Sequence, residues 1–90
     1  MEYQLMEYGN GFEILNDGEQ VGRIVWTLVD DVMIMDGTFI DPSLRGQDAG
    51  LKLLNLSAEH ARLHQYKMKA VCPYVVKMFE RSDAYNDVKM

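Results

Sequence analysis

The chain has 90 residues, 48% of them hydrophobic, and a formal net charge of −5. This length suffices for one small domain over residues 1–90 and is too short for two. No apolar run approaches the roughly 20 residues that cross a bilayer, and the negative net charge argues against general nucleic-acid binding.

The single cysteine cannot form an internal disulfide, and residues 1–8 lack the basic and long apolar parts of a signal peptide. We therefore expect a cytoplasmic protein with no membrane or nucleic-acid partner. Charge is uneven along the chain: residues 1–48 carry ten acidic and two basic side chains, and residues 49–90 carry four acidic and seven basic ones. Either the first part favours a cationic partner, or these are solvated faces without an assigned task.

The first 40 residues predict a meander of strands. Residues 12–15 alternate in polarity, and β-branched and aromatic side chains dominate 21–29 and 32–40. Turn signals separate these strands, and Glu2–Glu7 forms a possible fourth. Gly37 stands inside the third long strand, which indicates a bulge or a close approach by a ligand.

An amphipathic helix is predicted over Ala49–Gln65. Its two adjacent apolar stripes are Leu51, Leu54, Ala58 and Ala61, and then Leu53, Leu56 and Leu63. So wide an apolar arc suits a helix that packs on a sheet and touches a second element.

Lys67–Cys72 predicts a strand that returns after the helix. A strand–helix–strand crossover makes the two flanking strands parallel. Pro73 then opens a second helix that ends at about Arg81. We expect Tyr85 to pack back on the body and the tail after Asn86 to fray. The whole is predicted to be an α+β domain, with a mixed, mostly antiparallel sheet of about five strands and two helices.

The segment Phe39–Gly50 connects the third long strand to the predicted helix. A Pro- and Gly-punctuated turn before a helix start can direct several backbone N–H groups at one anion, and the helix dipole adds positive potential. Arg45 would add a cation, while Gly46 and Gly50 leave the backbone open to a ligand. The alternative is an ordinary strand–turn–helix connection.

Cys72 follows the predicted crossover strand and precedes the start of the second helix. A helix N-terminus stabilises a thiolate, so this thiol is either reactive or, as an alternative, a buried and inert one. Tyr74, one of five tyrosines, is the one nearest the turn and could protonate a leaving group.

His60 and His64 stand four residues apart on the predicted helix. That spacing can hold a metal, but no HExxH or CxxC pattern supplies further ligands. We therefore expect partial burial of the pair beside the apolar arc, and no metal site.

The order of these features resembles the GCN5-related N-acetyltransferase superfamily, and more narrowly its small single-domain members of the YjdJ type. The features are hairpin strands, an FxDPSLRGQxxG turn, a long helix, a strand, Cys72-Pro73-Tyr74 and a short helix. The likeness covers most of the chain, and it includes the tail segment Phe79–Tyr85. Arg45–Gly50 matches the superfamily's R/Q-x-x-G-x-G/A acetyl-CoA signature at its first and last positions.

The resemblance implies acetyl-CoA bound between the third long strand and the crossover strand. The implied cofactor-binding residues are Phe39, Ile40, Arg45, Gly46, Gln47, Asp48, Ala49, Gly50 and Lys77, with the pantetheine arm paired along Phe39 and Ile40. The resemblance places Cys72 beside the acetyl group as a candidate catalytic residue, and Tyr74, nearest the turn in the predicted topology, is the second candidate. An amine would attack the thioester directly, or acetyl would pass through Cys72.

Two positions depart from the superfamily's pattern. Asp48 replaces the central glycine of the signature; as an N-cap it would favour the free helix, and its charge would oppose a pyrophosphate. Gly37 stands where relatives commonly carry a histidine.

Two functional hypotheses follow. The first is an acetyl-CoA-dependent N-acetyltransferase acting on a small or protein amine, as a monomer or weak homodimer. The second is a non-catalytic CoA-binding or protein-interaction module on the same fold.

Overall fold

The structure is a computed structural model that describes all 90 residues. In chain order its elements are β1 (Glu2–Leu5), β2 (Gly11–Asn16), β3 (Glu19–Val29), β4 (Val32–Ile40), the 3-10 turn η1 (Pro42–Leu44), α1 (Ala49–His64), β5 (Lys67–Ala70), α2 (Pro73–Arg81) and the 3-10 turn η2 (Asp83–Tyr85).

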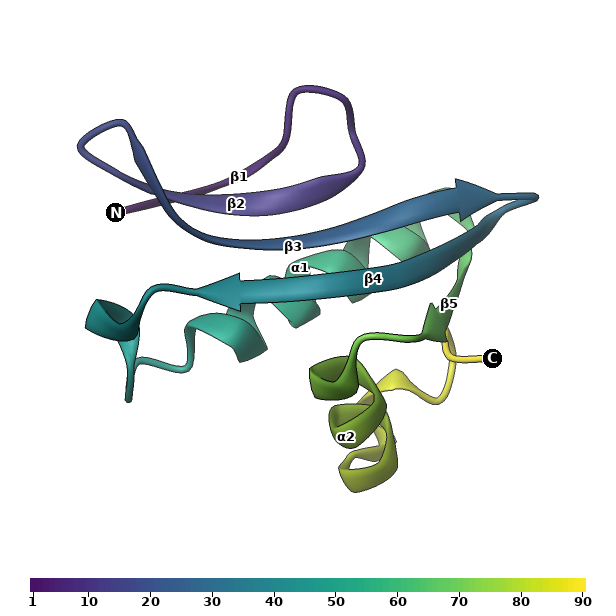
Figure 1. The fold of residues 1–90 in the computed structure, drawn as a ribbon. Helices are drawn as coiled ribbons and strands as arrows, with labels where there is room; N and C mark the ends of the chain where they lie inside the picture. The colour runs from purple at the N-terminus through teal and green to yellow at the C-terminus, as the bar shows by residue number, and fades with distance from the viewer.

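One sheet contains all five strands in the order β1-β2-β3-β4-β5. The first four pair antiparallel with their neighbours, whereas β4 and β5 are parallel. Helix α1 forms the crossover between β4 and β5 and lies behind β3 and β4, while α2 lies below the sheet (Figure 1). The predicted α+β fold, with its mixed sheet and two helices, is therefore confirmed.

A β-bulge interrupts the pairing of β3 with β4. Trp26 pairs with Met35 and Val25 pairs with Gly37, so Asp36 is an extra residue without a partner on β3. The bulge predicted at Gly37 is confirmed, with Asp36 as the inserted residue. A bulge bends its strand and increases the local twist, and here it falls where β4 leaves β5.

The hydrophobic core lies between α1 and one face of the sheet. Ile24, Trp26, Met33 and Met35 alternate with exposed or half-buried residues along β3 and β4, as expected when one face of a sheet is covered. From the first predicted stripe of α1, Leu54, Ala58 and Ala61 are fully buried and Leu51 is half-buried. The second predicted stripe is wrong at its end, because Leu63 is 79% exposed.

The segment after η2 is ordered against β5, so the predicted fraying of the tail after Asn86 is wrong. The Met68 N–H donates to the Val88 carbonyl at 2.7 Å, and the Met90 N–H donates to the Met68 carbonyl at 3.0 Å. Val88 is buried. The tail covers the outer edge of β5, which would otherwise present unpaired backbone groups.

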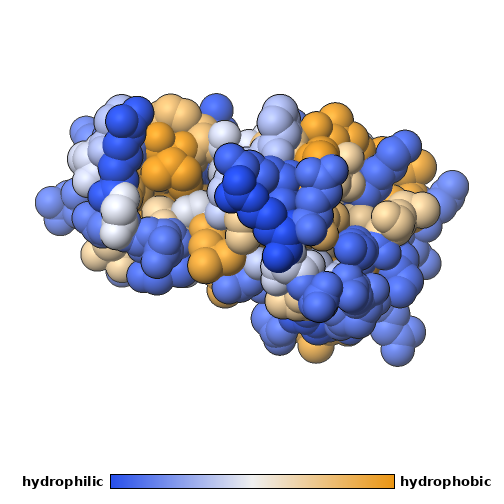
Figure 2. All heavy atoms as spheres, turned by 90° about the horizontal axis from the view of Figure 1, so that it is seen from below, coloured by the Kyte–Doolittle hydropathy of each residue, from blue (hydrophilic) through white to orange (hydrophobic).

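The strand predicted to reach Cys72 ends earlier, at Ala70. Tyr85 is buried, as predicted, and its ring centroid lies 5.3 Å from that of Phe79. Seen from below, the surface is mostly hydrophilic, and hydrophobic side chains emerge in separate patches (Figure 2). No helix has both the length and the apolar character needed to cross a membrane.

Candidate functional site

Strands β4 and β5 diverge immediately after the pair Met35 and Ala70. One more backbone hydrogen bond, from the Cys72 N–H to the Met35 carbonyl at 2.8 Å, joins the two segments before α2 begins. Beyond it, β4 continues through Asp36–Ile40 with no backbone partner on this side. An unpaired strand edge beside a helix start can accept an extended ligand as an additional strand.

The turn between β4 and α1 is the predicted anion cradle. Asp41 caps η1 by accepting a hydrogen bond from the Ser43 N–H at 2.9 Å, and Leu44 is buried. The following four residues, Arg45 to Asp48, are exposed. The N–H groups of Gly46, Asp48, Ala49 and Gly50 donate no hydrogen bond within the chain. The turn therefore leaves several donors free at the positive end of α1.

Asp48 occupies the N-cap position of α1 with a left-handed backbone, φ 54° and ψ 31°. Its side chain makes no capping hydrogen bond, so the prediction that it favours the helix as a capping residue is wrong. An N-cap side chain reaches the helix N–H groups from an extended backbone, and the left-handed conformation removes that geometry. Aspartate tolerates this conformation better than most residues, but glycine adopts it without strain.

Gly50 and Tyr74 bring the turn and α2 together. A Cβ atom added to Gly50 would lie 3.2 Å from both Cζ and the hydroxyl oxygen of Tyr74. The absence of a side chain at Gly50 thus lets the tyrosine ring lie against the start of α1. Burial, followed by the charges of Tyr85 and Asp48, raises the pKa of the Tyr74 hydroxyl, which therefore keeps its proton.

Cys72 is buried at the N-cap of α2 and contacts β4 through Thr38. The Thr38 Oγ1 and the Cys72 Sγ lie 3.4 Å apart. Burial raises the pKa of the thiol, but Thr38 and the facing backbone N–H groups of Val75 and Tyr74 outweigh it, so the net pKa lies below its usual value. The site thus favours a thiolate more than a free cysteine in water does.

The remaining predicted site residues lie around this centre. Phe39 is exposed and Ile40 half-buried at the unpaired end of β4, Ala49 is buried under the turn, and Lys77 is exposed one turn beyond Cys72 on α2. The fold brings Cys72, Tyr74 and Gly50 into one cluster, whereas Arg45 and Gln47 stand in solvent at its edge.

His60 and His64 lie at the other end of α1, away from the turn. Their ring centroids are 4.4 Å apart, and they join the rings of Phe12, Trp26 and Tyr66 in one aromatic cluster. His60 is half-buried, and burial together with His64 lowers its pKa. No group of three or more potential ligands could hold a metal ion. The predicted partial burial of the pair is therefore confirmed for His60 and wrong for His64, which is exposed.

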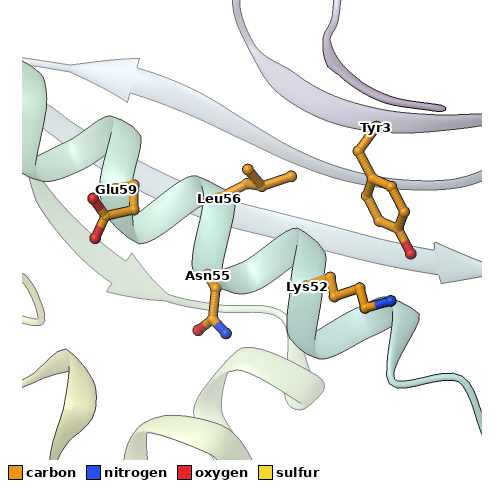
Figure 3. Close-up of a pocket in the computed structure, with 5 residues that line it drawn as sticks. All are labelled: Tyr3, Lys52, Asn55, Leu56 and Glu59. Carbon is orange, nitrogen blue, oxygen red and sulfur yellow. The ribbon is translucent and has the colours of Figure 1, made fainter.

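A shallow cavity of about 370 Å³ lies between β1 and the outer side of α1. Tyr3 points from β1 toward the helix, and Lys52, Asn55, Leu56 and Glu59 line the opposite wall (Figure 3). The Lys52 ammonium lies 5.8 Å from the centroid of the Tyr3 ring. Sequence reasoning placed Leu56 in the second apolar stripe and did not find the cavity, because the approach of Tyr3 to the helix leaves no local signal.

Two further residues near the divergence were missed by sequence reasoning as site residues. Thr38 contacts Cys72, and Asp36 accepts a hydrogen bond from the Thr27 Oγ1 at 2.7 Å. Gly37 indicated from the sequence that this part of β4 is irregular. The contacts of Thr38 with Cys72 and of Asp36 with Thr27 depend on the bulge and on the crossover through α1, so the sequence alone did not identify them.

The sheet order, the diverging parallel pair and the turn before α1 define an acyltransferase-like α+β fold. The structure is similar to the NMR solution structure of a GCN5-like protein from Staphylococcus aureus, with a TM-score of 0.80 and 33% sequence identity over 99% of this chain and 87% of that one. A sequence model described as GCN5-related N-acetyl-transferase matches residues 11–88. The chain therefore belongs to the GCN5-related N-acetyltransferase family. No curated protein matches it.

Proposed function

We propose that this protein is an acetyl-CoA-dependent N-acetyltransferase that transfers acetyl to a small or protein amine. Family membership supports acetyl transfer in general. The observation that carries the proposal is the unpaired edge of β4 beyond Met35, which lies beside both the turn and Cys72. The turn with backbone donors that have no partner and the Tyr74 hydroxyl support the same proposal.

The residues present suit acetyl-CoA. The free N–H groups of Gly46, Ala49 and Gly50 would bind its pyrophosphate, with Arg45 as a neighbouring cation. The backbone of Phe39 and Ile40 would pair with the pantetheine arm, because this edge of β4 has no other partner. Lys77, exposed on α2, would face the anionic part of the ligand.

Bound acetyl-CoA would supply a thioester that amines attack. Tyr74 keeps a proton at its hydroxyl oxygen, which it can donate to a departing thiolate. Cys72 lies at the start of α2, where the backbone N–H groups that stabilise its thiolate could equally stabilise an oxyanion. We propose direct transfer to the amine, with Cys72 as a polar neighbour, in preference to an acetyl-cysteine step.

An NMR titration of isotope-labelled protein with acetyl-CoA tests the proposal. We expect amide shifts centred on Arg45 to Gly50 and on Phe39, and an Arg45→Met variant should weaken binding about tenfold by removing one charged contact. Pantetheine, which lacks the pyrophosphate, is the matched control and should shift Phe39 without shifting the turn. The absence of any shift at millimolar acetyl-CoA would refute the proposal.

The second candidate is a non-catalytic CoA-binding or protein-interaction module. Asp48 favours it, because a carboxylate at the helix start opposes a pyrophosphate. The test is the double variant Gly37→His, Asp48→Gly. A side chain fits at position 37, where an added Cβ would meet only Val25 Cγ2 at 4.0 Å. Both proteins are tested for acetyl transfer to a panel of amines. Activity in the double variant and none in the unchanged protein would favour the binding module.

A further inference from the structure

The face of the sheet opposite α1 is open around the divergence of β4 and β5. Trp26 and Met35 turn toward α1 and are buried, so the alternate residues Thr27 and Ile34 turn to the opposite face. No helix crosses in front of β3 and β4 on this face (Figure 1). A molecule could therefore approach the divergence from the side that α1 leaves free.

Asp36 is the polar group at the apex of the divergence. It directly follows Met35, the last residue of β4 paired with β5, and it is the inserted residue of the bulge. Its Oδ2 accepts a 2.7 Å hydrogen bond from Thr27 Oγ1, which fixes the exposed carboxylate on the open face. The two ion pairs of the chain are both made by Arg62, so Asp36 has no cationic partner.

The surroundings of Asp36 combine free space with apolar side chains. Gly37 leaves an opening, since an added Cβ would meet only Val25 Cγ2 at 4.0 Å. Phe39 and Val71 are 43% and 52% exposed on the two diverging segments. A carboxylate beside an opening with an apolar rim fits a short alkyl chain that ends in an ammonium group.

Two cations share the open face, and neither pairs with Asp36. The Arg23 guanidinium lies over the Phe39 ring, 5.2 Å from its centroid. Lys69 stands opposite Ile34 on β5, one pair before the divergence. Glu13, opposite Arg23 on the same face, already accepts hydrogen bonds from Gln4 and Gln20. Asp36 accepts only one, from Thr27, and keeps acceptor capacity for an ammonium group.

We propose that Asp36 binds the acceptor of the transfer reaction, and that this acceptor is a primary alkylamine in its ammonium form. This inference rests on the proposed acetyltransferase function. The bound ammonium first loses one proton to water. The nitrogen lone pair then forms the C–N bond and the C–S bond of the thioester breaks. The Tyr74 hydroxyl gives its proton to the departing thiolate, and the second proton of the nitrogen passes to the Tyr74 oxygen. One acetamide, one CoA thiol and one free proton result.

The test compares pentylamine, a cation in neutral water, with aniline, which is neutral. For Asp36→Asn we expect about a tenfold higher KM for pentylamine, because one hydrogen bond to a charged group is lost. The kcat for pentylamine and the KM for aniline should stay unchanged. Glu19→Gln is the matched control, since it removes an equal charge from an exposed position at the start of β3. Thr27→Val, which releases the carboxylate, should raise the pentylamine KM by a smaller factor.

A binding measurement separates failure of this inference from failure of the proposed function. With CoA present, pentylamine is titrated into labelled protein and the amides of Thr27 and Gly37 are followed. About tenfold weaker binding in Asp36→Asn supports the inference even without turnover. Equal pentylamine affinity in both proteins, or an equal rise in the KM of aniline, would overturn it. Failure of acetyl-CoA to bind at Arg45–Gly50 would instead refute the proposed function.

Discussion

At its C-terminal end α1 is tied to the rest of the chain by many side-chain contacts, whereas at its N-terminal end it meets a turn with free backbone donors. Arg62 donates to both carboxylate oxygens of Asp87 and to the Ala84 carbonyl. Nearer the middle of the helix, the Tyr85 hydroxyl donates to Asn55 Oδ1 at 2.6 Å. The turn at Arg45–Asp48 makes no comparable side-chain bond. The contrast indicates that one end stabilises the fold, whereas the other leaves backbone donors without partners.

The largest expected effect comes from truncating Tyr85, which anchors α1 to the C-terminal segment. Tyr85→Ala should lower the free energy of unfolding by about 3 kcal/mol or more, because it removes a buried ring that packs on Phe79. Gln47→Ala in the turn should change it by less than about 0.5 kcal/mol. Urea denaturation of the two variants measures the difference, and equal losses would contradict the division between the ends.

A smaller effect is expected where the open end touches α2. Gly50→Ala places a Cβ 3.2 Å from the Tyr74 ring, and we expect a loss of about 1 kcal/mol from this overpacking. In a Tyr74→Ala background the same substitution should stabilise by up to about 1 kcal/mol, because alanine is the better helix former. A double-mutant cycle measures this coupling. If the effects of Gly50→Ala and Tyr74→Ala on stability are additive, the packing of the Tyr74 ring does not require glycine at position 50.

Relief of backbone strain at the turn should have a still smaller effect. Asp48→Gly removes a non-glycine residue from the left-handed region, and we expect a gain of about 0.5 kcal/mol after the entropic cost of glycine. Thermal unfolding of the variant measures the gain. Asp17→Gly, at φ 50° in the β2–β3 turn, is the matched control without a site nearby. A loss of stability at position 48 alone would show that the carboxylate has a structural task there.

The smallest expected effect is a pH dependence of the anchored end. Hydrogen bonds from Arg62 hold the pKa of Asp87 below its usual value. A carboxyl group whose folded-state pKa is lowered contributes stability above its unfolded pKa of about 3.9 and loses it as the pH falls through the folded value. Asp87→Asn should therefore flatten the acid loss of stability below about pH 4. Denaturation at several acidic pH values tests this, and an unchanged slope would contradict it.

Most of the fold could be predicted from local pattern. Alternating polarity gave β2–β4, the apolar arc gave α1, and Gly37 marked the bulge, because these signals depend on neighbours in the sequence. The ordered tail could not be predicted, since Val88 and Met90 pair with Met68 only after β5 has an open edge. At the candidate site, the residue types alone predicted a reactive thiol at Cys72 and a cation for anion binding at Arg45. Contacts such as Gly50 with Tyr74 depend on the crossover and carry no local signal.

The aromatic cluster at the anchored end of α1 has an optical consequence. Trp26 is the sole tryptophan of the chain, and its ring lies 5.3 Å from that of His60. Because the pKa of His60 is lowered, its imidazole stays neutral until the solution is more acidic than the usual pKa of about 6.5. A protonated imidazole quenches indole emission. The fluorescence of this protein should therefore dim on acidification below that value, and it reports on the end of α1 that carries His60.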